Sequence, residues 1–306
     1  GPCVVLIAGS GPTDRDWNNP LVPGAGTNGS GRQIAEALFE QGIGSIRYDK
    51  GAIGENQWPI SEVSLAFYGW EAALAWRTLA EDPSCGRVSF VGNSEGSMHA
   101  FRAAVGLQDD PRFGGVISLS GPAMTVMETV KLQLLYLYVH DSDEERAIAM
   151  AILDDLEARI RRLPEMEDGP PDLSSFAAAA SIWMQAVNPV QGELVRALLF
   201  LDPMEAVGAY RGPALVMAAD NDIQVAPTEA EAIFAGLAPS TASRRLIVVE
   251  DANHVFKHEP RSLFDADSMM SLALQYTAAG VPLADGLIDE ITNFLVSLKI
   301  SPSLCL

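Results

Sequence analysis

Ser94 lies at the centre of Gly92-Asn93-Ser94-Glu95-Gly96, and its hydroxyl could serve as a nucleophile. A largely apolar run over residues 88–91 precedes it and a helical pattern follows it, which predicts the order strand, tight turn, helix. The flanking glycines tolerate the strained backbone that such a turn requires. At the start of the helix, the serine would lie where developing negative charge is stabilised.

A serine hydroxyl is a weak nucleophile at neutral pH and needs a base, which is usually a histidine held by a carboxylate. Of the four histidines, His254 follows the apolar run 246–249 in a loop, so it can reach a site at the edge of a sheet. His258 lies about one helical turn further on and is the alternative. His99 and His140 lie in regions with helical patterns. We therefore predict that His254 is the base.

The carboxylate partner should lie between the serine and the histidine in the sequence. The run 214–218 predicts a fully buried strand, and Asp220 and Asp222 follow it directly. We favour Asp222, which lies further into the loop and just before an apolar residue that can fix its position. Asp220 remains the alternative, although aspartates at such positions often bond their own backbone in a turn.

Backbone N–H groups must stabilise the oxyanion of a tetrahedral intermediate. We expect one from Glu95, the residue after the serine, and a second from Ser10 in the glycine-rich loop 9–16. Gly11 is the alternative donor, and the proline that follows it has no N–H. A phosphate-binding role is disfavoured, because this loop lacks the Gly-Lys-Ser/Thr ending.

With these residues the chain resembles the α/β-hydrolases, and more narrowly bacterial carboxylesterases with a Gly-Ser-Gly-Pro-x-Asp-Arg-Asp oxyanion loop. The matching segments keep the family's order along nearly the whole chain: residues 9–16, Arg47-Tyr48-Asp49-Lys50 with Gly51 and Gly54, the Ser94 turn, the Asp222 loop and residues 253–257. The resemblance implies ester hydrolysis by Ser94, Asp222 and His254, without a metal or an organic cofactor.

The chain also departs from that family pattern at several positions. Those relatives usually have Gly-His-Ser-Glu-Gly-Gly, whereas here Asn93 replaces the histidine and Ser97 the last glycine. A glycine usually follows Asp-Arg-Asp, and here Trp17 takes its place, which makes this indole a candidate substrate-binding side chain. We expect Arg15 and the aspartates on either side of it to support the loop through salt bridges.

Six strand-like runs alternate with helical patterns, which predicts right-handed βαβ units and a mostly parallel sheet with helices on both faces. The expected strands are residues 3–8, 43–48, 87–91, 115–119, 214–218 and 244–249. The expected helices between and after them are residues 31–41, 61–81, 96–106, 228–237 and 286–298. We predict an α/β-hydrolase core formed by residues 1–121 and 212–306.

Residues 122–211 interrupt this rhythm, because they contain helical stretches near 124–139, 143–163 and 174–200 but no convincing strand. We predict that they form an inserted helical cap over the active site. The alternative is a set of outer helices without a role in substrate contact. The candidate substrate-binding residues of the cap are Met124, Met127 and Trp183, and further apolar candidates are Leu134, Tyr138, Met184 and Leu198.

The composition narrows the possible partners. The net charge is −20, which disfavours nucleic acid and anionic membranes as partners. No stretch approaches the roughly 18 uninterrupted apolar residues of a membrane span.

The three cysteines, Cys3, Cys85 and Cys305, are far apart and odd in number, so we predict neither a disulfide framework nor a metal site. We favour a cytoplasmic location, with a secreted protein as the alternative if the N-terminus is trimmed.

The leading hypothesis is thus a serine hydrolase that cleaves small-molecule carboxylic esters through an acyl-enzyme intermediate. A second hypothesis is a thioesterase, lactonase, amidase or peptidase with the same fold and the same catalytic residues, since the chemistry of the site is common to all of them. A third is a ligand-binding protein that keeps these residues but turns over slowly.

Overall fold

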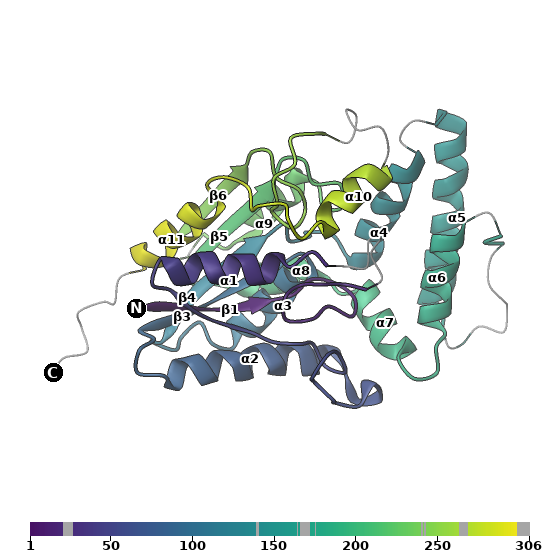
Figure 1. The fold of residues 1–306 in the computed structure, drawn as a ribbon. Coiled ribbons are helices and arrows are strands. Elements are labelled where there is room, and N and C mark those ends of the chain that lie inside the picture. The colour runs from purple at the N-terminus through teal and green to yellow at the C-terminus, as the bar shows by residue number, and fades with distance from the viewer. Residues whose placement is uncertain are drawn as a thin grey trace.

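A parallel six-stranded sheet forms the centre of the molecule in the computed structural model (Figure 1). The structure describes residues 1–20, 27–138, 141–163, 165, 172–174, 176–239, 241, 243–262 and 269–298. The strands are β1 (Pro2–Ile7), β2 (Gly44–Arg47), β3 (Arg87–Asn93), β4 (Phe113–Leu119), β5 (Ala214–Ala219) and β6 (Arg244–Val249). They are ordered β2-β1-β3-β4-β5-β6, and every neighbouring pair is parallel.

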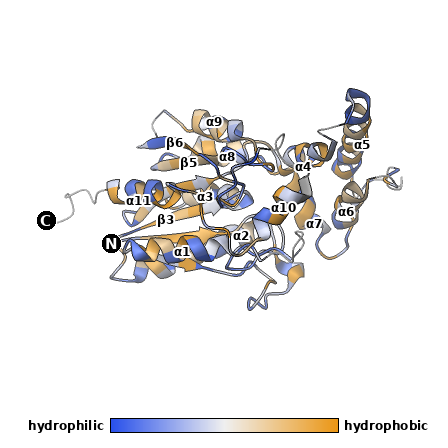
Figure 2. Cartoon of the chain, turned by 45° about the horizontal axis from the view of Figure 1, so that its top comes forward, coloured by the Kyte–Doolittle hydropathy of each residue, from blue (hydrophilic) through white to orange (hydrophobic). Residues whose placement is uncertain are grey.

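The strands are apolar along most of their length because helices cover both faces of the sheet. Every residue of β4 and of β5 is buried, and these strands carry no alternation of polar and apolar side chains. Figure 2 shows β3 and β5 as hydrophobic strands in the interior of the molecule. Each of the six predicted runs overlaps one strand, so the predicted parallel sheet with helices on both faces is confirmed.

Helices pack on the two faces of the sheet in separate layers. On one face lie α1 (Ser30–Glu40) and α11 (Leu287–Ser297); on the other lie α2 (Leu65–Glu81), α3 (Glu95–Val105), α8 (Pro203–Ala209) and α9 (Pro227–Gly236). The strand residues alternate between these layers, as the two-residue period of a strand requires. In β1, for example, Val5 belongs to the core beneath α2 and α3, and Leu6 to the core beneath α1 and α11.

A group of helices inserted after β4 has a core of its own and lies beyond the carboxyl ends of the strands (Figure 1). It contains α4 (Val126–Leu135), the 3-10 turn η2 (Tyr136–Tyr138), α5 (Asp143–Arg161), α6 (Ala177–Ala186) and α7 (Gly192–Leu199). The expected helix over 174–200 is two helices here, because Asn188 precedes a proline, which disfavours helical backbone. The Asn188 side chain then accepts the N–H groups of Val190 and Gln191.

The boundary expected at residue 211 differs from the packing of the chain. Helix α8 packs against α3 and α9, and its Val207 belongs to the core of the sheet together with Tyr210. This helix begins where Asp202 accepts the N–H of Met204 and Pro203 occupies the first turn, a favourable start for a helix. The separately packed insertion therefore ends before α8.

A disulfide joins Cys3 in β1 to Cys85, just before β3. The sequence-based expectation that these cysteines do not form a disulfide was wrong. They are 82 residues apart, but β1 and β3 are neighbours in the sheet, and this pairing brings the two Cα atoms to 5.5 Å. Cys305 lies outside the described residues.

Two further elements complete the description. The 3-10 turn η1 (Ile60–Glu62) precedes α2, and α10 (Met269–Thr277) follows β6. Among the described parts of the chain, we find no helix with the length and apolar character needed to span a bilayer.

Candidate active site

Ser94 occupies a strained turn between β3 and α3. Its φ of 55° and ψ of −126° are unusual for a residue with a side chain, and it caps the N-terminus of α3. The two glycines around it are required by close contacts. A Cβ on Gly92 would lie 2.3 Å from the carbonyl oxygen of Gly96, and a Cβ on Gly96 would lie 2.3 Å from that of Ile7. The predicted strand, turn and helix around this serine are therefore present.

His254 and Asp222 form a hydrogen-bonded pair at the carboxyl ends of β6 and β5. The distance from Nδ1 of His254 to Oδ2 of Asp222 is 2.8 Å, and the Asp222 side chain is fully buried. Its other oxygen accepts the N–H groups of Gln224 and Val225 at 2.7 and 3.0 Å. These bonds fix the carboxylate and direct Oδ2 to the ring. Asp220 instead accepts the N–H of Ala252, so the structure places Asp222 rather than Asp220 against the histidine.

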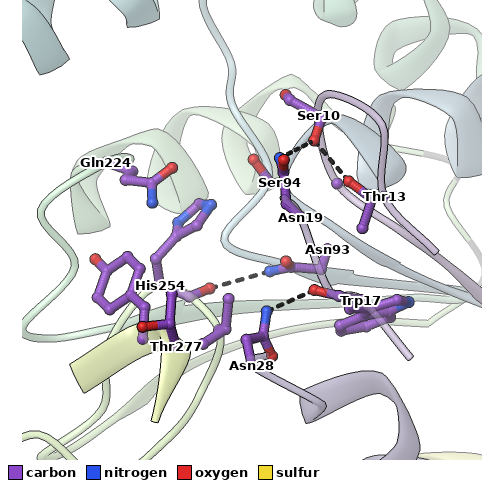
Figure 3. A pocket seen from close by; sticks show the side chains of 13 residues that line it. Ser10, Thr13, Trp17, Asn19, Asn28, Asn93, Ser94, Gln224, His254 and Thr277 are labelled. Atoms are coloured by element: carbon purple, nitrogen blue, oxygen red, sulfur yellow. Dashed lines mark hydrogen bonds between the residues drawn. The ribbon is translucent and has the colours of Figure 1, made fainter. Parts of the chain in front are cut away.

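Ser94 and His254 line one small cavity, of about 110 Å³ (Figure 3). Asn93, which stands where the similar family has a histidine, donates to the carbonyl of His254 at 3.0 Å and so connects the serine turn to the histidine loop. The alternative histidine, His258, is exposed and does not line this cavity. His99 is buried in α3 next to Glu95, and His140 lies outside the described residues.

Tyr276 of α10 packs on the histidine, and the sequence analysis did not single it out. Its ring is stacked on that of His254, with centroids 6.3 Å apart and planes inclined by 21°. Burial, together with the charge of Asp222, raises the pKa of Tyr276 well above its usual value, so its hydroxyl stays neutral. No local pattern marked this tyrosine, because its contact with the histidine spans a separate loop and helix.

The loop after β1 and the start of α3 each place one backbone donor beside the serine. A Cβ on Gly9 would lie 3.3 Å from the Cβ of Ser94, so the chain runs close to the serine here. The carbonyl of Ser10 accepts from Thr13 Oγ1 at 2.7 Å and from Asn19 Nδ2 at 3.0 Å (Figure 3). Within the described residues, we find no protein acceptor for the N–H of Ser10 or of Glu95. Both N–H groups are therefore available to an oxyanion.

A buried lysine connects these two donor residues. Lys50 Nζ donates to the carbonyl of Gly9 at 3.0 Å and to Glu95 Oε1 at 2.9 Å. Burial alone would raise the pKa of Glu95, but the charge of Lys50 and the hydrogen bond from His99 outweigh it and hold that pKa below its usual value. In a trans peptide the C=O and N–H point in opposite directions. Because the Gly9 carbonyl points to Lys50, the N–H of Ser10 points away from it.

Ion pairs support the loop, as the sequence analysis predicted, although the partners are different. Arg15 binds Asp49 with two nitrogens, at 3.1 and 2.7 Å, and also binds Glu55. The hydrogen bonds from Arg15 lower the pKa of Asp49 to about 2. Asp16 pairs with Arg47. These pairs join the loop after β1 to the loop after β2.

The backbone of Trp17 adopts a conformation that glycine adopts more easily than other residues. Its φ is 68°, in the left-handed region that favours glycine. The indole is 3% exposed and packs on Gly31 at the start of α1, where an added Cβ would lie 2.6 Å from the ring. Asn28 donates to the Trp17 carbonyl at 2.7 Å (Figure 3). Trp17 lines the small cavity, as predicted for a substrate-binding residue, although its contact with a substrate stays a prediction.

A second, larger cavity of about 370 Å³ lies between the core and the inserted helices, and Ser94 also lines it. One face of α4 and one face of α7 contribute residues at the three- and four-residue spacing of a helix. They are Val126, Thr129, Val130 and Gln133 from α4, and Gln191, Leu194, Val195, Leu198 and Leu199 from α7 and its N-cap.

The three cap residues predicted to bind substrate line neither cavity in this structure. Met127 and Trp183 instead belong to the insertion's own core, because they lie on the helix faces that meet α5 and α7. Met124 precedes α4, and its N–H donates to Glu229. Of the further candidates, Leu198 alone lines a cavity described here. The insertion has the expected apolar side chains, but its helices turn Met127 and Trp183 towards its own core and not towards a cavity.

No group of histidine, cysteine, aspartate and glutamate side chains suited to a metal ion is found in the described part of the chain. The described site brings together a serine, a carboxylate-bound imidazole and the N–H groups of Ser10 and Glu95.

Comparison with known proteins places the chain in a family. A sequence profile of the alpha/beta hydrolase family matches residues 4–266. Esterase EstD from Thermotoga maritima is 25% identical over 297 residues, which cover 96% of this chain and 62% of that protein. The chain thus spans less than two thirds of the length of this relative.

Solved structures show the same fold at low sequence identity. Est1E from Butyrivibrio proteoclasticus, a structure with bound ferulic acid, has a TM-score of 0.54 at 15% identity, covering 97% of this chain and 89% of that one. A monoacylglycerol lipase from Paleococcus ferrophilus has a TM-score of 0.52 at 15% identity, covering 97% and 95%. The profile match over most of its length shows that the chain belongs to the alpha/beta hydrolase family.

Proposed function

We propose that this protein is a serine carboxylesterase. Ser94 Oγ attacks the ester carbonyl while His254 takes its proton, and the N–H groups of Ser10 and Glu95 bind the oxyanion. The tetrahedral intermediate then breaks its bond to the alkoxy oxygen, which leaves as an alcohol with the proton from His254. Water repeats the sequence on the acyl-enzyme, releasing the carboxylic acid and restoring the serine. Asp222 fixes the ring and stabilises its charged form.

The observation that carries this proposal is the shared cavity of Ser94 and His254, with His254 bound to Asp222 at 2.8 Å. The two unpaired N–H groups beside the serine add the electrostatic part of the mechanism. An intact set of this kind also favours turnover over slow ligand binding. The likeness to an esterase of Thermotoga maritima supports ester cleavage as the reaction.

The test compares wild-type protein and Ser94→Ala on esters, thioesters, lactones and anilides of matched acyl length. We expect wild-type kcat/KM to be highest for esters. Ser94→Ala should lower kcat/KM for esters by at least about 10³-fold. The serine and the histidine act as a unit, so the loss of either one removes most of the catalysis that both provide. The variant should keep the wild-type melting temperature, since the loss of one hydroxyl leaves no cavity. A Ser94→Ala enzyme with more than a few per cent of wild-type activity would remove the serine from the mechanism.

The same panel separates the alternative activities. Preferential cleavage of thioesters, lactones or anilides would replace the carboxylesterase proposal with the corresponding activity of the same site. A wild-type protein that cleaves none of these substrates, yet binds esters, would support the slow ligand-binding alternative.

A further inference from the structure

The two cavities described above meet at the reacting atoms. Both are lined by Ser94, Ser10 and Gln224, and beyond these residues they extend in different directions. The smaller one continues towards His254 and α10, and the larger one continues beneath α4 and α7. An ester has two parts joined at the carbonyl carbon, so a substrate whose carbonyl lies at Ser94 would place one part in each cavity.

The position of His254 decides which part lies where. The leaving alcohol takes a proton from the imidazole, so its oxygen must lie on the side of the site that the ring faces. His254 lines the smaller cavity and is absent from the lining of the larger one. The alcohol therefore belongs on the side of the smaller cavity, and the acyl chain on the other side.

The two cavities differ in size and in the extent of their apolar walls. The smaller cavity, of about 110 Å³, is lined by Trp17, Val255 and Tyr276 and by polar side chains, of which Thr13, Asn28 and Thr277 bond within the protein. The larger cavity, of about 370 Å³, has an apolar wall formed by Val126 and Val130 of α4 and by residues of α7. The smaller cavity has room for a short group, and the apolar wall of the larger one suits an aliphatic chain.

The charged side chains that line the larger cavity are paired with each other, which disfavours a charged acyl group there. Lys50 and Glu95 line the cavity, but they pair with each other at 2.9 Å. Among its described lining residues, no other side chain is a carboxylate, lysine or arginine. A charged acyl chain would lose its hydration here without gaining an ionic partner.

We propose, on the basis of the esterase function above, that the substrates are esters of a neutral aliphatic acid of medium length and a short alcohol. The acyl chain lies between the core and the inserted helices α4 and α7, and the alcohol lies beside His254.

A pair of isomeric esters tests this assignment with the wild-type protein alone. Ethyl hexanoate and hexyl acetate have the same atoms and differ in which part carries the long chain. We expect kcat/KM to be at least about tenfold higher for ethyl hexanoate, because its four additional acyl methylenes can leave water for the apolar wall. A tenfold preference for hexyl acetate, or equal rates, would overturn the assignment.

Filling the larger cavity provides an independent readout. Leu198→Trp should lower kcat/KM for ethyl hexanoate at least about tenfold and change that for ethyl acetate less than about threefold. Leu198→Ala should shift the preferred acyl chain to greater length. Met184→Trp is the matched control, because Met184 is 66% exposed on α6 and lines neither cavity. If Leu198→Trp impairs hexyl acetate selectively, the acyl chain does not lie beneath α7.

Failure of this inference can be distinguished from failure of the proposed function. A wild-type protein that cleaves neither isomer, nor any other ester, would contradict the esterase proposal and this assignment with it. A wild-type protein that cleaves both isomers without the expected preference would contradict the assignment alone.

Discussion

At the scale of single residues, Lys50 connects the two backbone donors of the site. It binds the carbonyl of the peptide whose N–H belongs to Ser10, and it pairs with the side chain of Glu95, whose N–H is the other donor. Both of these bonds run from the lysine to protein atoms and not to a substrate. Its expected contribution is to fix the direction of the Ser10 N–H, which makes it a positioning residue.

We therefore expect Lys50→Met to lower kcat by about 10–100-fold with little change in KM, since an oxyanion donor acts mainly in the transition state. The variant should also lose about 3 kcal/mol of unfolding free energy, because it leaves the Glu95 carboxylate buried without its lysine. Steady-state kinetics and urea unfolding measure the two effects.

A double variant separates positioning from stability. Lys50→Met combined with Glu95→Gln removes the uncompensated charge, so stability should recover while kcat stays low. Lys131→Met is the control, because Lys131 forms ion pairs with Asp154 and Glu157 in the insertion and lines neither cavity. If kcat recovers together with stability in the double variant, the role of the lysine is structural only.

Glu71 of α2 makes a contribution to stability that depends on pH. One of its oxygens accepts from Asn56 at 2.9 Å, and the other is buried without a hydrogen-bond partner in the described structure. Burial raises the pKa of Glu71 to about 7. In the unfolded chain a glutamate loses its proton near pH 4.3. Between about pH 4 and 7 the folded protein therefore keeps a proton on Glu71 that the unfolded chain has lost. The stability linked to this group is full below that window and is lost as the pH rises through it.

Glu71→Gln should consequently raise the melting temperature at pH 8 and change it little at pH 4. The expected gain at pH 8 is on the order of 2 kcal/mol after allowance for solvent screening. Calorimetry at the two pH values measures the difference. A variant that stabilises the protein equally at both values would show that the benefit comes from packing and not from the proton.

At the scale of elements, the Cys3–Cys85 disulfide joins β1 to the segment before β3. Both strands carry loops of the site, since Ser10 follows β1 and Ser94 follows β3. The bond closes a loop of 82 residues.

Replacing both cysteines by alanine should lower the unfolding free energy by about 4 kcal/mol, because the unfolded chain regains the entropy of an open loop. For a chain of this size, that corresponds to a fall of roughly 6 °C in melting temperature. Dithiothreitol should produce a similar fall in the wild-type protein and none in the double variant. An unchanged wild-type melting temperature after complete reduction, verified by thiol titration, would contradict this contribution.

The elements that local patterns determine were predictable, and those that depend on distant contacts were not. The turn at Ser94 was recognisable because its strand, glycines and helix are adjacent in the sequence. The pairing of Cys3 with Cys85 depends on which strands are neighbours in the sheet. Met127 fits an apolar helix face equally well towards a substrate or towards α5, and periodicity does not decide between them. Tyr276 reaches the histidine through tertiary packing alone.

At the scale of the whole molecule, the parallel sheet is what assembles the site. Its strands all end at one edge, so residues that follow four of them meet there although they are far apart in the sequence. They are Ser10 after β1, Ser94 after β3, Asp222 after β5 and His254 after β6. This convergence could be predicted from the order of strands and helices. The walls of the two cavities could not, since they depend on how the inserted helices pack on the core.

The net charge of −20 belongs to the same scale. A strongly acidic surface repels anionic partners and leaves neutral substrates unaffected. This agrees with neutral esters as substrates, and with cavities whose charged lining residues are paired.

Ser94 is proposed to act as a nucleophile activated by His254. Intact-protein mass spectrometry after exposure to a fluorophosphonate tests this proposal most directly, because this reagent forms a covalent bond with an activated serine. We expect one adduct per chain, mapped by peptide sequencing to Ser94, and labelling slowed by at least about 10³-fold in His254→Ala. An unlabelled wild-type protein, an adduct on another residue, or equal labelling of the His254→Ala variant would contradict the account.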